Sequence, residues 1–208
     1  MSRGGPNKVY IAHSHAQAFL ACHDGRPRFR RPILAIVGGT RLGKSMLAAD
    51  TLRRVGASLG IPDFLEVTVE DSEQMDLADF NRAQHCGVLL DGVGDTLFLK
   101  RNREALQGRP KIVRGAKSAT NMYSYCYSFC GRAVVATFDL SASNLHELTT
   151  DHWLANRDNV LCLRLEEPAY FDPQAQAAQA PVSPQGRGQH KRRWIASPIR
   201  KLSFREAE

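Results

Sequence analysis

The feature that most constrains this chain is a strand, a glycine-rich loop and a helix in direct succession over residues 33–59. Residues 33–37 form an unbroken apolar run, typical of a central strand in a sheet that is covered on both faces. Residues 38–45 then have the spacing G-x-x-x-x-G-K-S, and apolar residues at helical intervals follow. In this context the spacing predicts a P-loop, the Walker A motif.

A P-loop binds the phosphates of a nucleoside triphosphate. Its backbone N–H groups and the helix N-terminus supply many donors at short range, and the helix dipole favours negative charge. Lys44 is expected to bridge phosphate oxygens, and the Ser45 hydroxyl to bind Mg²⁺. The sequence therefore predicts ATP and Mg²⁺ as ligands. The predicted nucleotide-binding residues are Gly38, Gly39, Thr40, Arg41, Leu42, Gly43, Lys44 and Ser45.

A second acidic position follows another apolar run. Residues 86–90 end in Asp91, giving C-G-V-L-L-D-G, which is the Walker B pattern. A buried strand of this kind delivers a carboxylate beside the phosphates, where it holds Mg²⁺ directly or through water. The alternative is an aspartate that only closes a strand into a turn. A later apolar run, over residues 133–138, ends in Asp139.

Alternating strand and helix patterns predict an α/β fold. We expect a P-loop NTPase with a parallel sheet of about five strands and helices on both faces. Helices are expected over 70–84, 96–109 and 140–155, and a strand or hairpin arm over 122–130 with aromatic residues packed in the core. The domain boundaries are predicted as an N-terminal arm with a short helix (1–28), the P-loop domain (29–171) and a disordered basic tail (172–208).

The charge is unevenly distributed. The net charge is +7, and residues 100–117 carry seven basic residues against one acid, whereas residues 62–80 carry seven acids and no base. Clustered positive charge is compatible with a nucleic-acid partner, although charge runs also occur as solvated faces. The candidate nucleic-acid contacts are Arg109, Lys111, Arg114 and Lys117.

Composition favours a soluble intracellular protein without a membrane partner. No apolar run is long enough to span a bilayer, and the N-terminus lacks the apolar region of a signal peptide. The basic triplet at 191–193 is a weak nuclear-address signal. The five cysteines are an odd number and are widely spaced, so we expect free thiols.

The order of these parts resembles the superfamily-3 helicase ATPase domain, as found in replication-initiator proteins of small circular single-stranded DNA viruses. The resemblance covers residues 29–165. It rests on the P-loop strand, an acidic segment, a strand that follows His85 and ends in Asp91, a basic segment, the strand V-V-A-T-F-D and an arginine before a last strand. It implies a helicase-like ATPase that assembles as a homo-oligomeric ring and acts on single-stranded DNA, or on RNA.

The resemblance also implies roles for single residues. Asp139 stands where the family has an asparagine that senses the terminal phosphate. Lys117 matches a basic hairpin loop that grips single-stranded DNA, and Arg157 matches an arginine finger that reaches the nucleotide of a neighbouring subunit. The family's Walker B strand ends in two acids, whereas Asp91 is followed by Gly92, with Asp95 as a possible substitute.

Two alternatives stay open. A nucleotide or small-molecule kinase shares the P-loop, and residues 101–114 would then serve as its arginine-bearing lid. The second alternative is a catalytically inactive relic that binds nucleotide or nucleic acid. It follows from the two differences at catalytic positions, because an ionised aspartate at 139 cannot donate a hydrogen bond.

Overall fold

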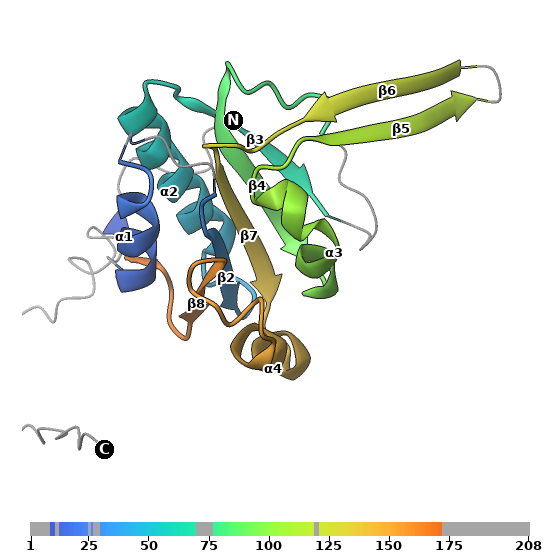
Figure 1. The fold of residues 1–208 in the computed structure, drawn as a ribbon. Coiled ribbons are helices and arrows are strands. Elements are labelled where there is room, and N and C mark those ends of the chain that lie inside the picture. The colour runs from blue at the N-terminus through green and yellow to red at the C-terminus, as the bar shows by residue number, and fades with distance from the viewer. Residues whose placement is uncertain are drawn as a thin grey trace, which may run out of the picture.

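Five strands form one parallel sheet in the computed structural model, which describes residues 9–10, 13–24, 26, 30–69, 77–118 and 121–171. For 9–10, 114–118, 121–123, 142 and 171 it describes the backbone alone. The strand order is β3 (Asp63–Thr68), β4 (His85–Val93), β7 (Ala133–Asp139), β2 (Ile33–Gly38) and β8 (Val160–Leu165) (Figure 1). All four neighbouring pairs are parallel. The prediction of an α/β fold with five parallel strands is confirmed.

The sheet is covered on both faces, as the apolar run in β2 predicts. All six residues of β2 are buried, and successive side chains point to opposite faces. Leu34 and Ile36 pack with α1 (Ser14–Ala21) and α2 (Lys44–Leu59). Ile33, Ala35 and Val37 pack with α3 (Leu97–Leu106) and α4 (Ala142–Thr150) on the other face (Figure 1). Two separate hydrophobic clusters therefore hold the sheet between helices.

Helix α2 follows the loop directly and fixes it to the sheet. Ala48, Leu52 and Val55 are fully buried at helical spacing. The helix ends at Gly60, whose φ of 68° is the left-handed conformation that glycine adopts without strain. The strand, loop and helix predicted from the sequence are thus present in that order.

The prediction of a helix over residues 70–84 is wrong for those of its residues that the structure describes. Residues 70–76 lie outside the described residues, and 77–84 form turns. The Asn81 side chain accepts a hydrogen bond from the N–H of Ala83 at 2.9 Å, a local contact that competes with helix formation. Leu77 and Phe80 are buried in the core, which holds these turns against the sheet.

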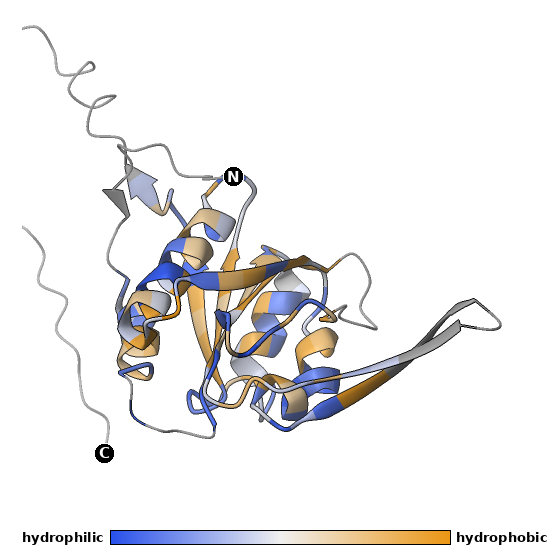
Figure 2. Cartoon of the chain, turned by 90° about the horizontal axis from the view of Figure 1, so that it is seen from above, coloured by the Kyte–Doolittle hydropathy of each residue, from blue (hydrophilic) through white to orange (hydrophobic). Residues whose placement is uncertain are grey.

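The basic segment after α3 forms a strand. β5 (Lys111–Ser118) pairs with β6 (Asn121–Tyr127) as an antiparallel hairpin. The hairpin extends away from the sheet and its helices (Figures 1 and 2). The predicted hairpin arm is confirmed, and Tyr127 and Phe129 at its base are buried as core residues.

A small two-stranded ribbon joins the two ends of the described chain. β1 (Val9–Tyr10) pairs antiparallel with β9 (Tyr170–Phe171). Helix α1, assigned to an N-terminal arm from the sequence, contributes the buried Phe19 to the core. The expected disordered tail and its basic triplet lie outside the described residues. Within the described residues, no helix has the length and apolar character needed to cross a membrane.

Candidate functional site

The loop between β2 and α2 contains two residues in the left-handed backbone region. Arg41 has a φ of 66° and Gly43 a φ of 83°. Such reversals turn successive N–H groups toward one concavity, a common form of anion site. The first turn of α2 adds N–H groups that have no acceptor within the helix. The geometry suits a phosphate group at this position.

Lys44 lies across this loop with all three of its ammonium donors satisfied. Its Nζ donates to the carbonyl oxygens of Gly38 and Gly39, each at 2.8 Å, and to Oδ1 of Asp139 at 2.8 Å. The Lys44 side chain is only 11% exposed. The lysine is therefore held at the mouth of the loop, where a phosphate oxygen would replace one of its acceptors.

Asp139 ends β7, the strand that lies between the P-loop strand and the strand of Asp91. Its side chain is 77% exposed and faces Lys44. An ionised carboxylate only accepts hydrogen bonds, so it cannot donate one to a phosphate as an asparagine would. A bound triphosphate must replace Asp139 as an acceptor for Lys44. Its phosphates then lie close to the negative charge of the Asp139 carboxylate.

Asp91 joins the loop to the strands. Its Oδ1 accepts a hydrogen bond from Ser45 at 2.7 Å and another from Thr137 at 2.6 Å. No described residue donates to its second carboxylate oxygen. A serine hydroxyl beside a carboxylate oxygen suits Mg²⁺, which prefers hard oxygen ligands. Ser45 and Asp91 are thus the residues that would hold the metal.

Gly92 explains why a second acid does not follow Asp91. Its φ of 74° is left-handed, and its N–H donates to Thr137 at 2.9 Å. An aspartate or glutamate at this position would be strained. Asp95, the possible substitute, instead caps the start of α3, because its Oδ1 accepts from the N–H of Leu97 at 2.8 Å.

Arg157 lies at the opposite end of the sheet from the loop. It precedes β8, whose first residue Val160 pairs with Ile33, the first residue of β2. The six residues of β2 span about 20 Å. Arg157 is exposed and forms no ion pair among the described residues, with the neighbouring Asp158 or with any other acid. It lies too far away to act at its own P-loop.

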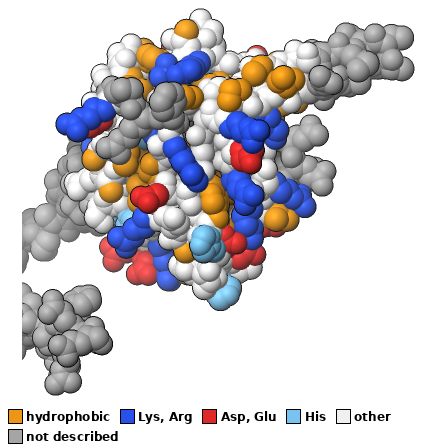
Figure 3. Space-filling view, in the orientation of Figure 1, with side chains coloured by type: hydrophobic (Ala, Val, Ile, Leu, Met, Phe, Trp, Pro, Cys, Tyr) orange, Lys and Arg blue, Asp and Glu red, His pale blue; other side chains and the backbone are white. Residues whose placement is uncertain are grey.

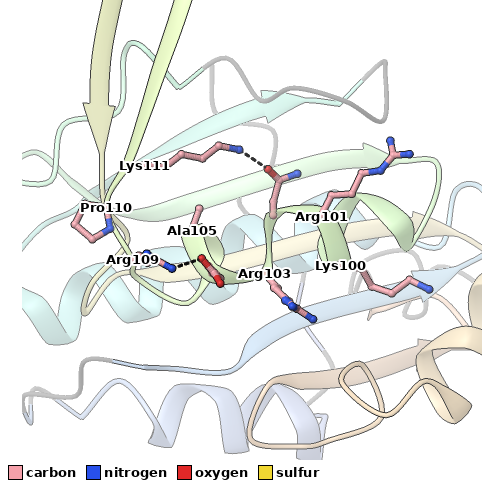
Figure 4. Close-up of a pocket in the computed structure, with 9 residues that line it drawn as sticks. Lys100, Arg101, Arg103, Ala105, Arg109, Pro110 and Lys111 are labelled. Atoms are coloured by element: carbon pink, nitrogen blue, oxygen red, sulfur yellow. Dashed lines mark hydrogen bonds and ion pairs between the residues drawn. The ribbon is translucent and has the colours of Figure 1, made fainter.

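Basic side chains line a hollow of about 390 Å³ along α3 and the start of β5 (Figure 4). Lys111 donates to the Asn102 amide oxygen at 2.9 Å, and Arg109 pairs with Glu104. Arg103 points away from both pairs, and no described residue pairs with it. Lys and Arg side chains gather on this face of the molecule (Figure 3). The side chains of Arg114 and Lys117, farther along β5, lie outside the described part.

A second hollow of about 460 Å³ continues this surface, sharing Arg103, Glu104 and Arg109 with the first and adding Trp153. Arg30 lies there and donates to the Asn159 amide oxygen at 2.8 Å. We call the cations of the two hollows the basic surface. Its members are Arg30, Lys100, Arg101, Arg103, Arg109 and Lys111.

The second hollow lies at the amino end of the sheet. Gln107, which lines the second hollow, donates to Asn159, the residue before β8, at 2.9 Å. The lid that the kinase alternative requires, residues 101–114, therefore includes residues at the end of the sheet opposite the P-loop. No described contact brings them to the phosphate loop.

Lys100, at one edge of the basic surface, joins α3 to α4. It forms ion pairs with Glu147 at 2.8 Å and Asp151 at 3.6 Å. The hydrogen bond from Lys100, with another from Thr96, lowers the pKa of Glu147. The hydrogen bond with Glu147 raises the pKa of Lys100. The charge of Lys100 is therefore already neutralised, unlike that of Arg103.

No protein-family model and no curated protein sequence matches the chain. NtrX from Brucella abortus, solved with ATP, is 15% identical over 78% of this chain, with a TM-score of 0.33, and this chain spans 39% of NtrX. A possible uridine kinase from Bacillus stearothermophilus is 13% identical over 71% of this chain and 97% of its own length, with a TM-score of 0.28. The fold assignment rests on the topology of this chain.

Proposed function

We propose that this protein binds ATP with Mg²⁺ at its P-loop and acts as a helicase-like NTPase on single-stranded nucleic acid. The observation that carries the proposal is the contact between Ser45 and Asp91, 2.7 Å apart although 46 residues separate them in sequence. It joins the first turn of α2 to the end of β4, beside Lys44. A serine and an aspartate meeting next to a P-loop lysine are the parts that an ATP–Mg²⁺ site requires.

Binding exchanges partners within the site. Lys44 leaves Asp139 and takes oxygens of the β- and γ-phosphates, while the loop N–H groups surround the phosphate chain. Ser45 and Asp91 would hold Mg²⁺, which would supply neutralising charge at the terminal phosphates. Thr137 orients Asp91 through its hydrogen bond.

Hydrolysis transfers the γ-phosphoryl group to water. The oxygen of water bonds to the γ-phosphorus, the bond to the β–γ bridging oxygen breaks, and ADP and inorganic phosphate leave with release of the water proton. Asp91 and Asp139 are the acids that accept hydrogen bonds from Ser45 and Lys44. A second candidate function, nucleotide binding without turnover, is favoured by Gly92 and by the acid at position 139.

The nucleic-acid part of the proposal is supported by basic side chains that form no ion pair among the described residues. Arg30, Arg103 and Lys111 have no carboxylate partner among the described residues. Trp153 lines the second hollow together with Arg30 and Arg103. Positive charge that tracks a phosphate backbone, with an aromatic ring for stacking, suits single-stranded DNA or RNA.

Assembly as a ring is supported by the position of Arg157. An arginine at the amino end of the sheet reaches a nucleotide only on a neighbouring subunit. Its guanidinium is fully charged and binds phosphate oxygens in pairs. Arginine fingers increase turnover by about 10³–10⁵ in P-loop enzymes.

ATP turnover with and without a single-stranded DNA oligonucleotide tests the proposal. Stimulation by DNA in the parent, and loss of turnover in Lys44→Ala, are expected. ATP binding without any turnover would leave the second candidate function. A requirement for a small phosphate acceptor would instead identify a kinase.

Mixing two inactive variants tests the ring. Arg157→Ala is expected to lose turnover but keep ATP affinity, and mixing it with Lys44→Ala is expected to restore part of the activity. A hybrid interface then pairs one intact P-loop with one intact Arg157. Arg53→Ala, an exposed arginine on α2, is the matched control and should not need rescue. Absence of rescue, with a parent that stays monomeric with ATP and DNA, would remove the ring.

A further inference from the structure

The segment after β8 lies directly on the P-loop. The N–H of Ala169 donates to the carbonyl oxygen of Leu42 at 2.9 Å. A Cβ placed on Gly43 would lie 2.7 Å from Cε1 and 2.8 Å from Cδ1 of Tyr170, so the tyrosine ring touches the α-carbon of Gly43. Glycine is therefore required at position 43 for its φ of 83° and for this close approach.

The tyrosine is held from two sides. Ala169 is fully buried, and Tyr170 is half-buried. Tyr170 belongs to β9, where its backbone pairs with Tyr10 in β1. The ribbon and the P-loop thus fix the ring position before any ligand arrives, which lowers the entropic cost of binding against it.

The strand order determines which way a nucleotide must lie. Asp139 ends β7, and Asp91 lies two residues before the end of β4. Both strands lie on one side of β2, whereas β8 lies on the other side. The metal and the terminal phosphate belong beside these acids. The phosphate chain then leads the nucleoside toward β8, whose last residue Leu165 pairs with Gly38 at the start of the loop. Tyr170 follows Leu165 by five residues on that side.

We infer that Tyr170 forms the nucleobase side of the ATP site, with its ring as a stacking surface for the base. The inference rests on the proposed function, because it presumes that phosphates bind in the loop. Aromatic rings stack on the faces of all nucleobases, so the contact increases affinity without selecting one base strongly. The sequence alone does not reveal this residue, because it lies 125 positions after Ser45 and belongs to no motif.

The test compares a ligand that has a base with one that has none. Binding of ATP and of inorganic tripolyphosphate, both with Mg²⁺, is measured by calorimetry for the parent, Tyr170→Ala and Tyr170→Phe. Tyr170→Ala is expected to bind ATP about tenfold more weakly. Its affinity for tripolyphosphate should stay unchanged, and Tyr170→Phe, which keeps the ring, should resemble the parent with both ligands.

Other results would overturn the inference. An equal loss for both ligands would mean that Tyr170 only supports the loop, and tighter ATP binding in Tyr170→Ala would mean that the ring blocks the site. No change would exclude a contact with the base. If Tyr170→Ala does not fold, Tyr170→Leu keeps bulk against Gly43 without the aromatic face and gives the same comparison. A parent that binds neither ligand would contradict the proposed function itself.

Discussion

The charged side chains at the two ends of the parallel sheet have different kinds of partner. At the carboxyl end, Lys44 pairs with Asp139, and Asp91 accepts from Ser45 and Thr137. At the amino end, Arg30 and Lys111 donate to neutral amide oxygens. Arg103 and Arg157, also at that end, have no partner among the described residues.

Under the proposed function, this difference suits two kinds of ligand. The paired groups at the carboxyl end would separate for a ligand that brings both negative phosphate and a positive metal ion. The basic side chains at the amino end would attract a polyanion over a distance, and this attraction would weaken as salt rises. Substitutions at the two ends should therefore change different binding equilibria.

The largest effect is expected at the metal position. Asp91→Asn replaces a carboxylate by a neutral amide, a poorer ligand for a hard cation. It should weaken Mg²⁺-dependent ATP binding by at least about tenfold, as measured by titration with and without Mg²⁺. Asp95→Asn is the matched control, because Asp95 lies four residues away and caps α3. An unchanged Mg²⁺ dependence in Asp91→Asn would mean that Asp91 only accepts hydrogen bonds from Ser45 and Thr137 and does not bind the metal.

The amino end should respond in nucleic-acid binding alone. Arg103→Ala is expected to weaken binding of a single-stranded DNA oligonucleotide several-fold and to lower the slope of log affinity against log salt by about one. ATP affinity should not change. Arg53→Ala removes the same charge from α2, on the other face of the sheet. Equal losses in the two variants would show that only net charge matters.

A smaller effect is expected where Asp139 faces Lys44. Asp139→Asn removes a like charge from beside the phosphates and restores a hydrogen-bond donor. Two charges about 4 Å apart in water repel by about 1 kcal/mol, so ATP affinity should rise about fivefold. The same titration measures it. A loss of affinity would mean that the Asp139 carboxylate itself contributes to binding, through the metal ion.

The smallest effect concerns the contact that joins α3 to α4. Hydrogen bonds from Lys100 and Thr96 lower the pKa of Glu147, so folding favours its ionised form. The stabilisation is present above the ordinary pKa of 4.5 and is lost as the pH falls through the lowered value. Glu147→Gln should reduce the free energy of unfolding by less than about 1 kcal/mol at pH 7.

Urea unfolding at several pH values measures this effect. The difference between parent and Glu147→Gln should shrink as the pH falls below 4.5. Glu167→Gln, an exposed acid after β8, is the control and should match the parent. A difference that grows on acidification would contradict the assignment of the pKa to the Lys100 contact.

The carboxyl end was predictable because its parts are local in sequence or end a strand. The P-loop is contiguous, and Asp91 and Asp139 each follow an apolar run, so parallel strands bring them to one edge. Thr137 was missed, since one threonine inside an apolar strand is common and its partner lies 46 residues away. The only signal was a polar residue between Ala136 and Phe138.

The amino end was only partly predictable. The basic segment around Arg109 and Lys111 was recognised from its charge, but its strand conformation was not, because hairpin pairing depends on β6. Arg30, Arg103 and Trp153 come from three distant parts of the chain, and only the fold brings them together. The predicted helix at residues 77–84 was wrong because the prediction rested on acidic composition, which is common in helices. In the structure, Asn81 stabilises turns there.

The most direct test of the account is the affinity of the parent and of Lys44→Ala for ATP with Mg²⁺, measured by calorimetry. The account predicts saturable binding by the parent and at least about tenfold weaker binding by Lys44→Ala, because its ammonium donates to the loop and would donate to phosphate. Circular dichroism should show that the variant stays folded. Equal affinity in the two proteins would contradict the P-loop assignment.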